Sequence, residues 1–201
     1  MILVVGRPGL DQEDRLDRLA GSVARQIAAT GTQVELVGSV GDDVDGEEVA
    51  LALGRAEVGH AALLRDPAGV TPRAGGPGGP LPRLDREDVA LGLSYLVECS
   101  ALVVAESLPA DVMQECAGAA TYHSAPLIAV VDPGQPAPTG LPADATVLER
   151  PSSADSPFSQ LVASYAVAVS GGASPEQAWA TAVRRSGFEP VDGSQPTGSD
   201  E

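Results

Sequence analysis

Short apolar runs recur along the chain and predict the strands of a sheet. They are continuous rather than alternating, as is typical of strands that are covered on both faces. The runs are residues 2–5, 34–40, 101–105, 127–131 and 146–148. Each is rich in Val, Ile, Leu or Ala, so both faces of the predicted sheet should be buried.

Ala-rich amphipathic stretches lie between these runs and predict helices. They are residues 11–30, 46–55, 86–99 and 109–122, followed by 157–170 and 175–186 near the end of the chain. Regular alternation of strand and helix is the pattern of a parallel sheet with right-handed crossovers. The predicted fold class is therefore α/β, with a mostly parallel sheet between two layers of helices.

Three segments interrupt this pattern. Residues 67–83 include a Gly/Pro run without apolar periodicity and predict a flexible loop, and residues 135–144 form a second Pro-rich connection. Residues 189–201 are polar, acidic and rich in Gly, Ser and Pro, so we expect a disordered acidic tail there. The remainder, residues 1–188, predicts a single domain.

The charge balance excludes several kinds of function. The chain of 201 residues has 28 acidic and 12 basic residues, for a net charge of −16, and every basic residue is Arg. A binder of duplex nucleic acid or of an anionic membrane needs a basic surface, so we expect neither partner. The absence of Lys also removes a P-loop lysine and a Schiff-base lysine.

The cysteines, histidines and N-terminus add only weak signals. Cys99 and Cys116 form no CxxC pair and are expected to be free thiols, and His60 and His123 fit no metal-ligand spacing, so no metal site is predicted. The apolar start of the chain lacks a basic region and predicts a strand rather than a signal peptide. No run is long enough to span a membrane. We therefore expect a soluble, cytoplasmic protein.

One segment resembles a known family. Gly31 is followed by a strand, then by Gly41-Asp42-Asp43, and then by a helix that begins near Gly46. This arrangement resembles the PfkB (ribokinase-like) carbohydrate kinases, in which a Gly-Asp-Asp turn opens a helix. Gly41 permits a tight turn, and an Asp after it can cap the helix or face a polyol hydroxyl. A simple Asp cap on a Rossmann-like helix is the alternative interpretation.

Further segments agree with the family in their order along the chain. Asp11 follows the first strand, where family members place a sugar-binding Asp, and Ser22 stands where the family has an Asn. The segments at 84–89, 101–109, 127–133 and 172–182 resemble the family's later helices and strands. The similarity covers most of residues 1–188 and implies a shortened, divergent ribokinase-like domain.

The resemblance implies a reaction and the residues for it. The family transfers a phosphoryl group from Mg-ATP to a hydroxyl of a sugar or nucleoside, a reaction that depends on positioning and charge stabilisation. Asp155 aligns with the catalytic base, and Ser153 and Ala154 with the anion hole before the helix. Asp11, Ser22, Gly41 and Asp42 correspond to the substrate side.

Structural alternatives stay open for the same residues. Ser156 with Pro157 would make a good helix start without any chemistry, and Asp11 and Asp42 would serve equally well as turn or cap residues.

The sequence also departs from the family. Arg18 and Leu19 replace a Gly-Gly pair, the anion-hole glycines are missing, and the chain contains no Asn for the family's Asn-containing magnesium motif. The lid strands expected after Thr71-Pro72 and part of the nucleotide-binding region have no counterpart. We therefore expect phosphoryl transfer to be impaired or lost.

Three hypotheses follow from these observations. The first is a minimal sugar kinase with Mg-ATP. The second is a non-catalytic metabolite-binding or protein-interaction module on the same fold, acting as a homodimer or with a partner protein. The third is an unrelated Rossmann-like domain.

Overall fold

The main sheet consists of six parallel strands. A computed structural model describes residues 1–151 and 156–187. Its strands lie in the order β5-β4-β1-β6-β7-β8, and every neighbouring pair is parallel. Their bounds are β1 (Ile2–Val5), β4 (Val34–Gly41), β5 (Leu63–Asp66), β6 (Ala101–Val104), β7 (Leu127–Val131) and β8 (Thr146–Glu149). The predicted α/β class with a parallel sheet is confirmed.

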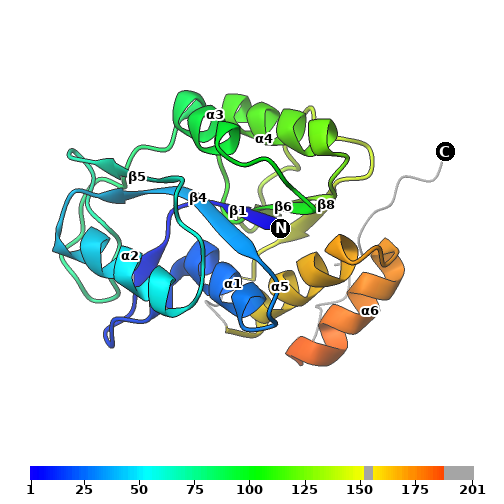
Figure 1. Ribbon diagram of the computed structural model, residues 1–201, viewed down its shortest axis with the longest axis horizontal. Coiled ribbons are helices and arrows are strands. Elements are labelled where there is room, and N and C mark those ends of the chain that lie inside the picture. The colour runs from blue at the N-terminus through cyan, green and yellow to red at the C-terminus, as the bar shows by residue number, and fades with distance from the viewer. Residues whose placement is uncertain (152–155, 188–201) are drawn as a thin grey trace.

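Helices cover both faces of this sheet (Figure 1). One layer contains α3 and α4, and the other contains α1, α2 and α5, with α6 packed beside α5. Their bounds are α1 (Arg18–Ala28), α2 (Val44–Arg55), α3 (Arg86–Ser94), α4 (Ala110–His123), α5 (Ser156–Ser170) and α6 (Pro175–Ser186). The result is a three-layer αβα arrangement.

The continuous apolar runs are explained by this double cover. In β1, Ile2 and Val4 join the core beneath α1 and α5, whereas Leu3 and Val5 join the core beneath α3 and α4. All four side chains are fully buried. Burial of an aliphatic side chain of this size contributes about 1.5–3 kcal/mol, so the apolar runs supply much of the driving force for folding.

The order of the strands reverses between β1 and β6. From β1 the chain adds strands outward through β4 and β5, and from β6 it adds them in the other direction through β7 and β8. In open parallel sheets the ligand binds outside the carboxyl ends of the strands at such a switch point. The loops after these strands are therefore the place to search for a site.

The segment at residues 11–17 is a hairpin and not the start of a helix. β2 (Gly9–Leu10) pairs with β3 (Leu16–Asp17) in antiparallel fashion, and α1 begins only at Arg18. The Oδ1 of Asp11 accepts hydrogen bonds of 2.9 Å from the backbone N–H groups of Glu13 and Arg15. These bonds favour a tight turn over a helix, which is why the prediction for this segment was wrong.

The other differences from the predicted elements are smaller. The helix expected over 86–99 ends at Ser94, and the short strand β5 was not predicted because only its first two residues are apolar. Between β5 and α3, where the sequence has no counterpart of the family's lid strands, the described residues form no further named strand. Residues 153–155 and the expected tail at 189–201 lie outside the described residues.

The Gly/Pro loop at 67–83 is bonded to the hairpin. The N–H of Leu10 donates to the carbonyl of Pro72 at 2.9 Å, and the N–H of Ala74 donates to the carbonyl of Leu10 at 2.8 Å. Within the loop, the N–H of Val70 donates to the carbonyl of Pro80 at 2.8 Å. The loop therefore runs beside β2, and its expected flexibility stays a prediction.

Candidate functional site

A cavity of about 520 Å³ opens between the β2–β3 hairpin, α1 and the first turn of α5. It brings together Asp11 and Ser22, two of the residues that the sequence predicts to bind substrate. The lining residues are Asp11, Arg15, Leu16, Asp17, Arg18, Leu19, Ser22, Arg25, Arg150 and Ser159. Since Arg150 follows β8 and the hairpin follows β1, the cavity lies at the carboxyl edge of the sheet.

Asp11 shapes the hairpin as well as lining the cavity. Besides the two backbone bonds to its Oδ1, its Oδ2 accepts a 2.6 Å bond from the Nε of Arg15. The backbone N–H of Arg15 lowers the pKa of this carboxyl below its usual value. Asp11 is thus a negatively charged acceptor at neutral pH, and a carboxylate has about four lone-pair positions, so one stays available to a ligand.

Three polar residues of α1 face the cavity. Arg18, Ser22 and Arg25 are spaced four and three residues apart, which places them on one face of the helix. The hydroxyl of Ser22 makes no hydrogen bond to any described residue, and Arg25 has no ion pair within the described part of the chain. Sequence reasoning missed Arg25, although its spacing from Ser22 was a usable signal.

A hydrogen bond joins α5, which forms one wall of the cavity, to α1. Ser159, in the first turn of α5, is almost fully buried, and its Oγ accepts a 2.6 Å hydrogen bond from the Nε2 of Gln26. Ser159 lies four residues after Asp155 in the sequence. The hydrogen bond therefore fixes the beginning of the helix that follows the predicted catalytic segment.

Asp155, Ser153 and Ala154 themselves lie outside the described residues. Their predicted roles as base and anion hole stay predictions. In the sequence they stand between β8 and α5.

Charged side chains at the switch point between β1 and β6 form ion pairs with one another. The backbone N–H of Arg7 donates to Glu106 Oε1 at 2.7 Å, and its guanidinium lies 3.1 Å from Oε2. Arg18 approaches the same carboxylate at 3.6 Å, and the Nε of Arg7 donates to the carbonyl of Pro82 at 2.6 Å. Arg7 is therefore occupied by Glu106 and by the Gly/Pro loop.

Gly41 and Asp42 lie outside the cavity. The N–H of Gly41 donates to the Oγ1 of Thr71 at 2.8 Å, and a Cβ on Gly41 would approach the Oδ2 of Asp43 to 2.5 Å. Asp42 is largely exposed and pairs with Arg65 at 3.6 Å. The structure thus gives Gly41 a close-packing role, and neither Gly41 nor Asp42 lines the cavity with Asp11 and Ser22.

The helix-capping alternative is realised at the neighbouring residue Asp43. Its Oδ1 accepts a 2.7 Å hydrogen bond from the N–H of Gly46, and its Oδ2 accepts a 2.8 Å bond from the N–H of Thr71. Asp43 therefore caps α2 and also anchors the beginning of the Gly/Pro loop.

A smaller hollow of about 230 Å³ lies at the carboxyl ends of β6 and β7. Its lining is mainly apolar, with Leu108, Met113 and Pro136, and includes the carboxylate of Glu106. No arginine is among the described residues that line it. A triphosphate carries several negative charges, and this hollow offers it no cation.

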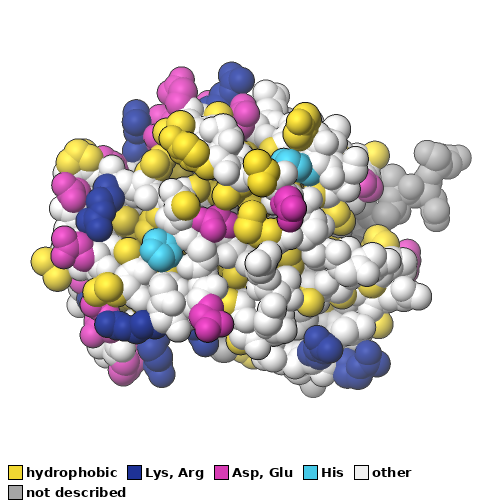
Figure 2. Space-filling model, in the orientation of Figure 1, with side chains coloured by type: hydrophobic (Ala, Val, Ile, Leu, Met, Phe, Trp, Pro, Cys, Tyr) yellow, Lys and Arg dark blue, Asp and Glu magenta, His cyan; other side chains and the backbone are white. Residues whose placement is uncertain are grey.

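The described part of the chain contains no reactive cysteine and no group of side chains that could hold a metal ion. Burial raises the pKa of Cys99 to about 11 and that of Cys116 to about 12, so neither is a thiolate at neutral pH. Figure 2 shows the two histidines as separate patches. Within residues 1–151 and 156–187, no three His, Cys, Asp or Glu side chains are grouped to hold a metal, and no helix has the length and hydropathy to cross a bilayer.

The fold is that of the ribokinase-like (PfkB) carbohydrate kinases. A carbohydrate kinase from Agrobacterium tumefaciens superposes with a TM-score of 0.63 over 92% of this chain and 89% of its own, at 15% identity. A ribokinase from Arabidopsis thaliana, solved with ribose and ATP, matches at 0.63 over 92% and 90%, with 14% identity. A PfkB protein from Polaromonas sp. JS666 matches at 0.65 over 92% and 94%, with 10% identity.

These likenesses confirm the resemblance seen in the sequence at the level of the fold. No protein-family model and no curated protein matches the chain in sequence. The chain is accordingly a divergent representative of this fold, and its activity has to be argued from its own residues.

Proposed function

We propose that this protein binds a sugar or a related polyol in the cavity, and that phosphoryl transfer is impaired or lost. The observation that supports this most is that Asp11 and Ser22 line one cavity together with Ser159, from the helix that follows Asp155. The protein would then be a cytoplasmic pseudoenzyme that retains the substrate side of a kinase fold.

The chemistry of the lining suits a polyol. Ser22 can donate and accept a hydrogen bond, Asp11 can accept, and the guanidinium groups can only donate. A sugar hydroxyl needs both kinds of partner, and a concave site with a few convergent polar groups is typical of small-molecule binding. A volume of about 520 Å³ lies within the usual range for such sites.

We propose that phosphoryl transfer is impaired because the chain lacks parts that would bind the nucleotide. Only residues 150–155 connect β8 with α5, so this connection offers no room for the strands that the family uses to hold the nucleotide base. The described residues that line the hollow near Glu106 include no cation that could pair with the phosphates of ATP. A base without a positioned donor loses the several kcal/mol that alignment supplies (about 7–11 kcal/mol at best).

A second candidate function is an active sugar kinase. The place of Asp155 in the sequence, directly before α5, whose residue Ser159 lines the cavity, favours it. Asp155 would then take the proton of the attacking hydroxyl, and Mg-ATP would be the phosphoryl donor.

Thermal denaturation with a panel of neutral, phosphorylated and carboxylated sugars and nucleosides tests the binding function. A ligand at 100 times its Kd stabilises the folded state by about 2.7 kcal/mol, which raises Tm by several degrees in a chain of this size. We expect at least one polyol to raise Tm for wild type and for Ser94→Ala, an exposed control on α3, but much less for Ser22→Ala.

The same samples decide between the two candidates. With Mg-ATP at millimolar concentration we expect no rise in Tm and no sugar-dependent release of ADP. Sugar-dependent ADP release that disappears in Asp155→Asn would support the active kinase and contradict the proposed loss of transfer. A panel in which no polyol raises Tm would contradict the binding function.

A further inference from the structure

We infer that the ligand of the cavity carries a negative charge, as a phosphorylated or carboxylated polyol, and that Arg25 binds the charged group. This inference rests on the proposed function, because it names the class of polyol that the same cavity takes. It follows from the charge of the lining, from the pairing of each arginine and from the direction of the arginine side chains.

The charge of the lining is the reverse of the charge of the chain. The whole chain has 28 acidic residues against 12 arginines, whereas the described residues that line the cavity include four arginines and two aspartates. The arginines are Arg15, Arg18, Arg25 and Arg150. One third of all arginine side chains thus border one cavity, and a cleft with an excess of one sign of charge concentrates ligands of the opposite sign.

The four arginines are not equally neutralised. Arg15 lies 2.6 Å from Asp11 and 3.0 Å from Glu13, and Arg150 lies 2.6 Å from Asp132. These two side chains have carboxylate partners at short distance. They are therefore held in place by the protein and contribute mainly to the shape of the cavity wall.

The positive charges of Arg18 and Arg25 are not neutralised at short distance by a carboxylate of the described residues. Arg18 reaches Glu106 only at 3.6 Å, and Glu106 is already bound at shorter distance by Arg7. Arg25 has no ion pair with any residue in the described part of the chain. A guanidinium offers five N–H donors in a planar fork that matches a phosphate or a carboxylate, so these two groups can bind either anion.

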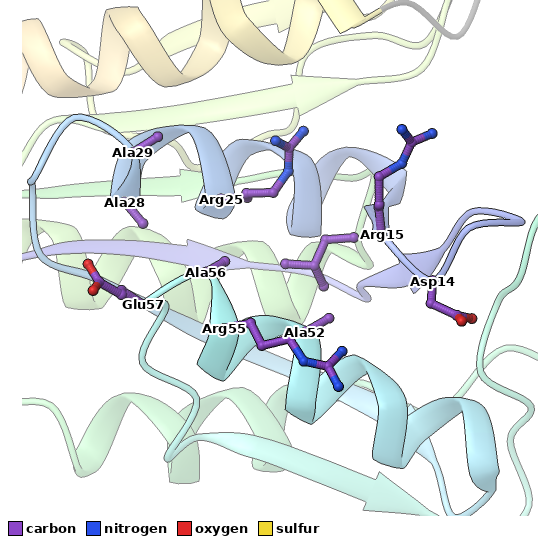
Figure 3. A pocket seen from close by; sticks show the side chains of 10 residues that line it. Asp14, Arg15, Arg25, Ala28, Ala29, Ala52, Arg55, Ala56 and Glu57 are labelled. Atoms are coloured by element: carbon purple, nitrogen blue, oxygen red, sulfur yellow. The ribbon is translucent and has the colours of Figure 1, made fainter.

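Two of the four arginine side chains extend away from α2 (Figure 3). Figure 3 looks into the neighbouring groove between α1 and α2, whose wall includes Ala28, Ala52 and Ala56. Arg15 and Arg25 extend there to the same side of α1, away from α2. Both residues line the cavity as well as this groove, so a ligand in the cavity can reach them.

A purely structural role of Arg25 makes a different prediction. Arg25 lies in the last turn of α1, where a cation interacts favourably with the helix C-terminus. In that case Arg25→Gln would lower the stability of the ligand-free protein and would not change the choice of ligand. The experiment therefore measures both quantities.

The test is calorimetric titration of the full chain with ribose, ribose 5-phosphate, gluconate and inorganic phosphate. We compare wild type, Arg25→Gln and Arg185→Gln. Arg185 is a matched control because it is exposed on α6 and likewise has no ion pair to a described residue. Tm of each ligand-free variant is measured alongside.

We expect wild type and Arg185→Gln to bind ribose 5-phosphate or gluconate at least tenfold more tightly than ribose. In Arg25→Gln this preference should fall below threefold, while Tm without ligand matches that of Arg185→Gln. The stronger of the two anionic ligands identifies the charged group as phosphate or carboxylate. Raising the salt concentration should weaken the anionic ligand more than ribose.

Three outcomes would overturn the inference. The first is that charged and neutral polyols bind wild type with Kd values within twofold of each other. That result would contradict the inference and leave the sugar-binding function unaffected. An equal effect of Arg25→Gln and Arg185→Gln on the preference would also contradict it. If inorganic phosphate binds and no polyol does, the cavity holds an anion site, but both the proposed function and the inference that rests on it are contradicted.

Discussion

The Nε2 of Gln26 lies 2.6 Å from the Oγ of Ser159 and joins two helices that are far apart in the sequence. Gln26 belongs to α1, which carries Ser22 and Arg25, and Ser159 belongs to the first turn of α5. The bond therefore determines how the two walls of the cavity lie relative to each other. A change at either residue should affect both stability and binding.

Gln26→Ala should lower the free energy of unfolding by about 1 kcal/mol, because it removes one side-chain hydrogen bond at a partly buried position. It should also weaken binding of the polyol that the wild type prefers. Urea denaturation measures the first effect. Gln114→Ala, at an exposed position of α4, is the control, and an equal loss of stability in the two variants would contradict the role of this bond.

Glu106→Gln should be more costly, since it leaves Arg7 without its charged partner near the switch point. Both side chains are about 15% exposed, and hydrogen bonds to charged groups contribute about 1.5–3 kcal/mol each. Glu48→Gln breaks the exposed pair with Arg55 and should change stability by less than about 0.5 kcal/mol. Urea denaturation measures the free energy of unfolding of both variants. Equal losses in Glu106→Gln and Glu48→Gln would contradict a stabilising role of the pair between Arg7 and Glu106.

Two helical glycines should respond to alanine in opposite directions. A Cβ on Gly46 would lie 2.2 Å from the carbonyl oxygen of Gly41, so Gly46→Ala must displace backbone and should destabilise the protein by more than about 1 kcal/mol. Gly118, in α4, has no atom within 4 Å of its added Cβ. Gly118→Ala should therefore raise stability by about 0.5–1 kcal/mol through helix propensity alone. A stabilised Gly46→Ala would show that the corner at Gly41 is not closely packed.

Asp43 should make stability depend on pH in the acidic range. Burial raises the pKa of its carboxyl, but hydrogen bonds from Thr71 and Gly46 outweigh burial and hold the pKa below the ordinary value of 3.8. A group with a lowered pKa in the folded state stabilises that state above its unfolded pKa, and the contribution is lost as pH falls below about 4.

Asp43→Asn keeps a residue that can cap α2 but removes the charge. The free energy of unfolding of wild type should fall more steeply than that of Asp43→Asn between pH 5 and pH 3, as measured by urea denaturation at each pH. Parallel curves for the two proteins would contradict this assignment.

The strands and most helices follow directly from the sequence because their signal is local. A run such as residues 2–5 is apolar on both faces, and only a strand covered by two layers of helices buries all of it. The hairpin at 11–17 was missed because its polar residues fit a helix pattern equally well. Only the carboxylate bonds of Asp11 select the turn.

The candidate site was predicted in part. Asp11 and Ser22 do line one cavity, but Gly41 and Asp42 lie elsewhere, because Asp43 and Thr71 bind that corner to the Gly/Pro loop. The arginine lining could not be found by comparison with the family's motifs, since it depends on where the hairpin and α5 place side chains around α1.

The most direct test of the central claim is nuclear magnetic resonance of one sample that contains the protein, the preferred polyol and Mg-ATP. Saturation transfer from the protein to the polyol reports binding, and the phosphorus spectrum reports transfer. We predict saturation transfer to the polyol while the γ-phosphate signal of ATP stays constant. A new phosphomonoester signal that grows as ATP is consumed would contradict the account.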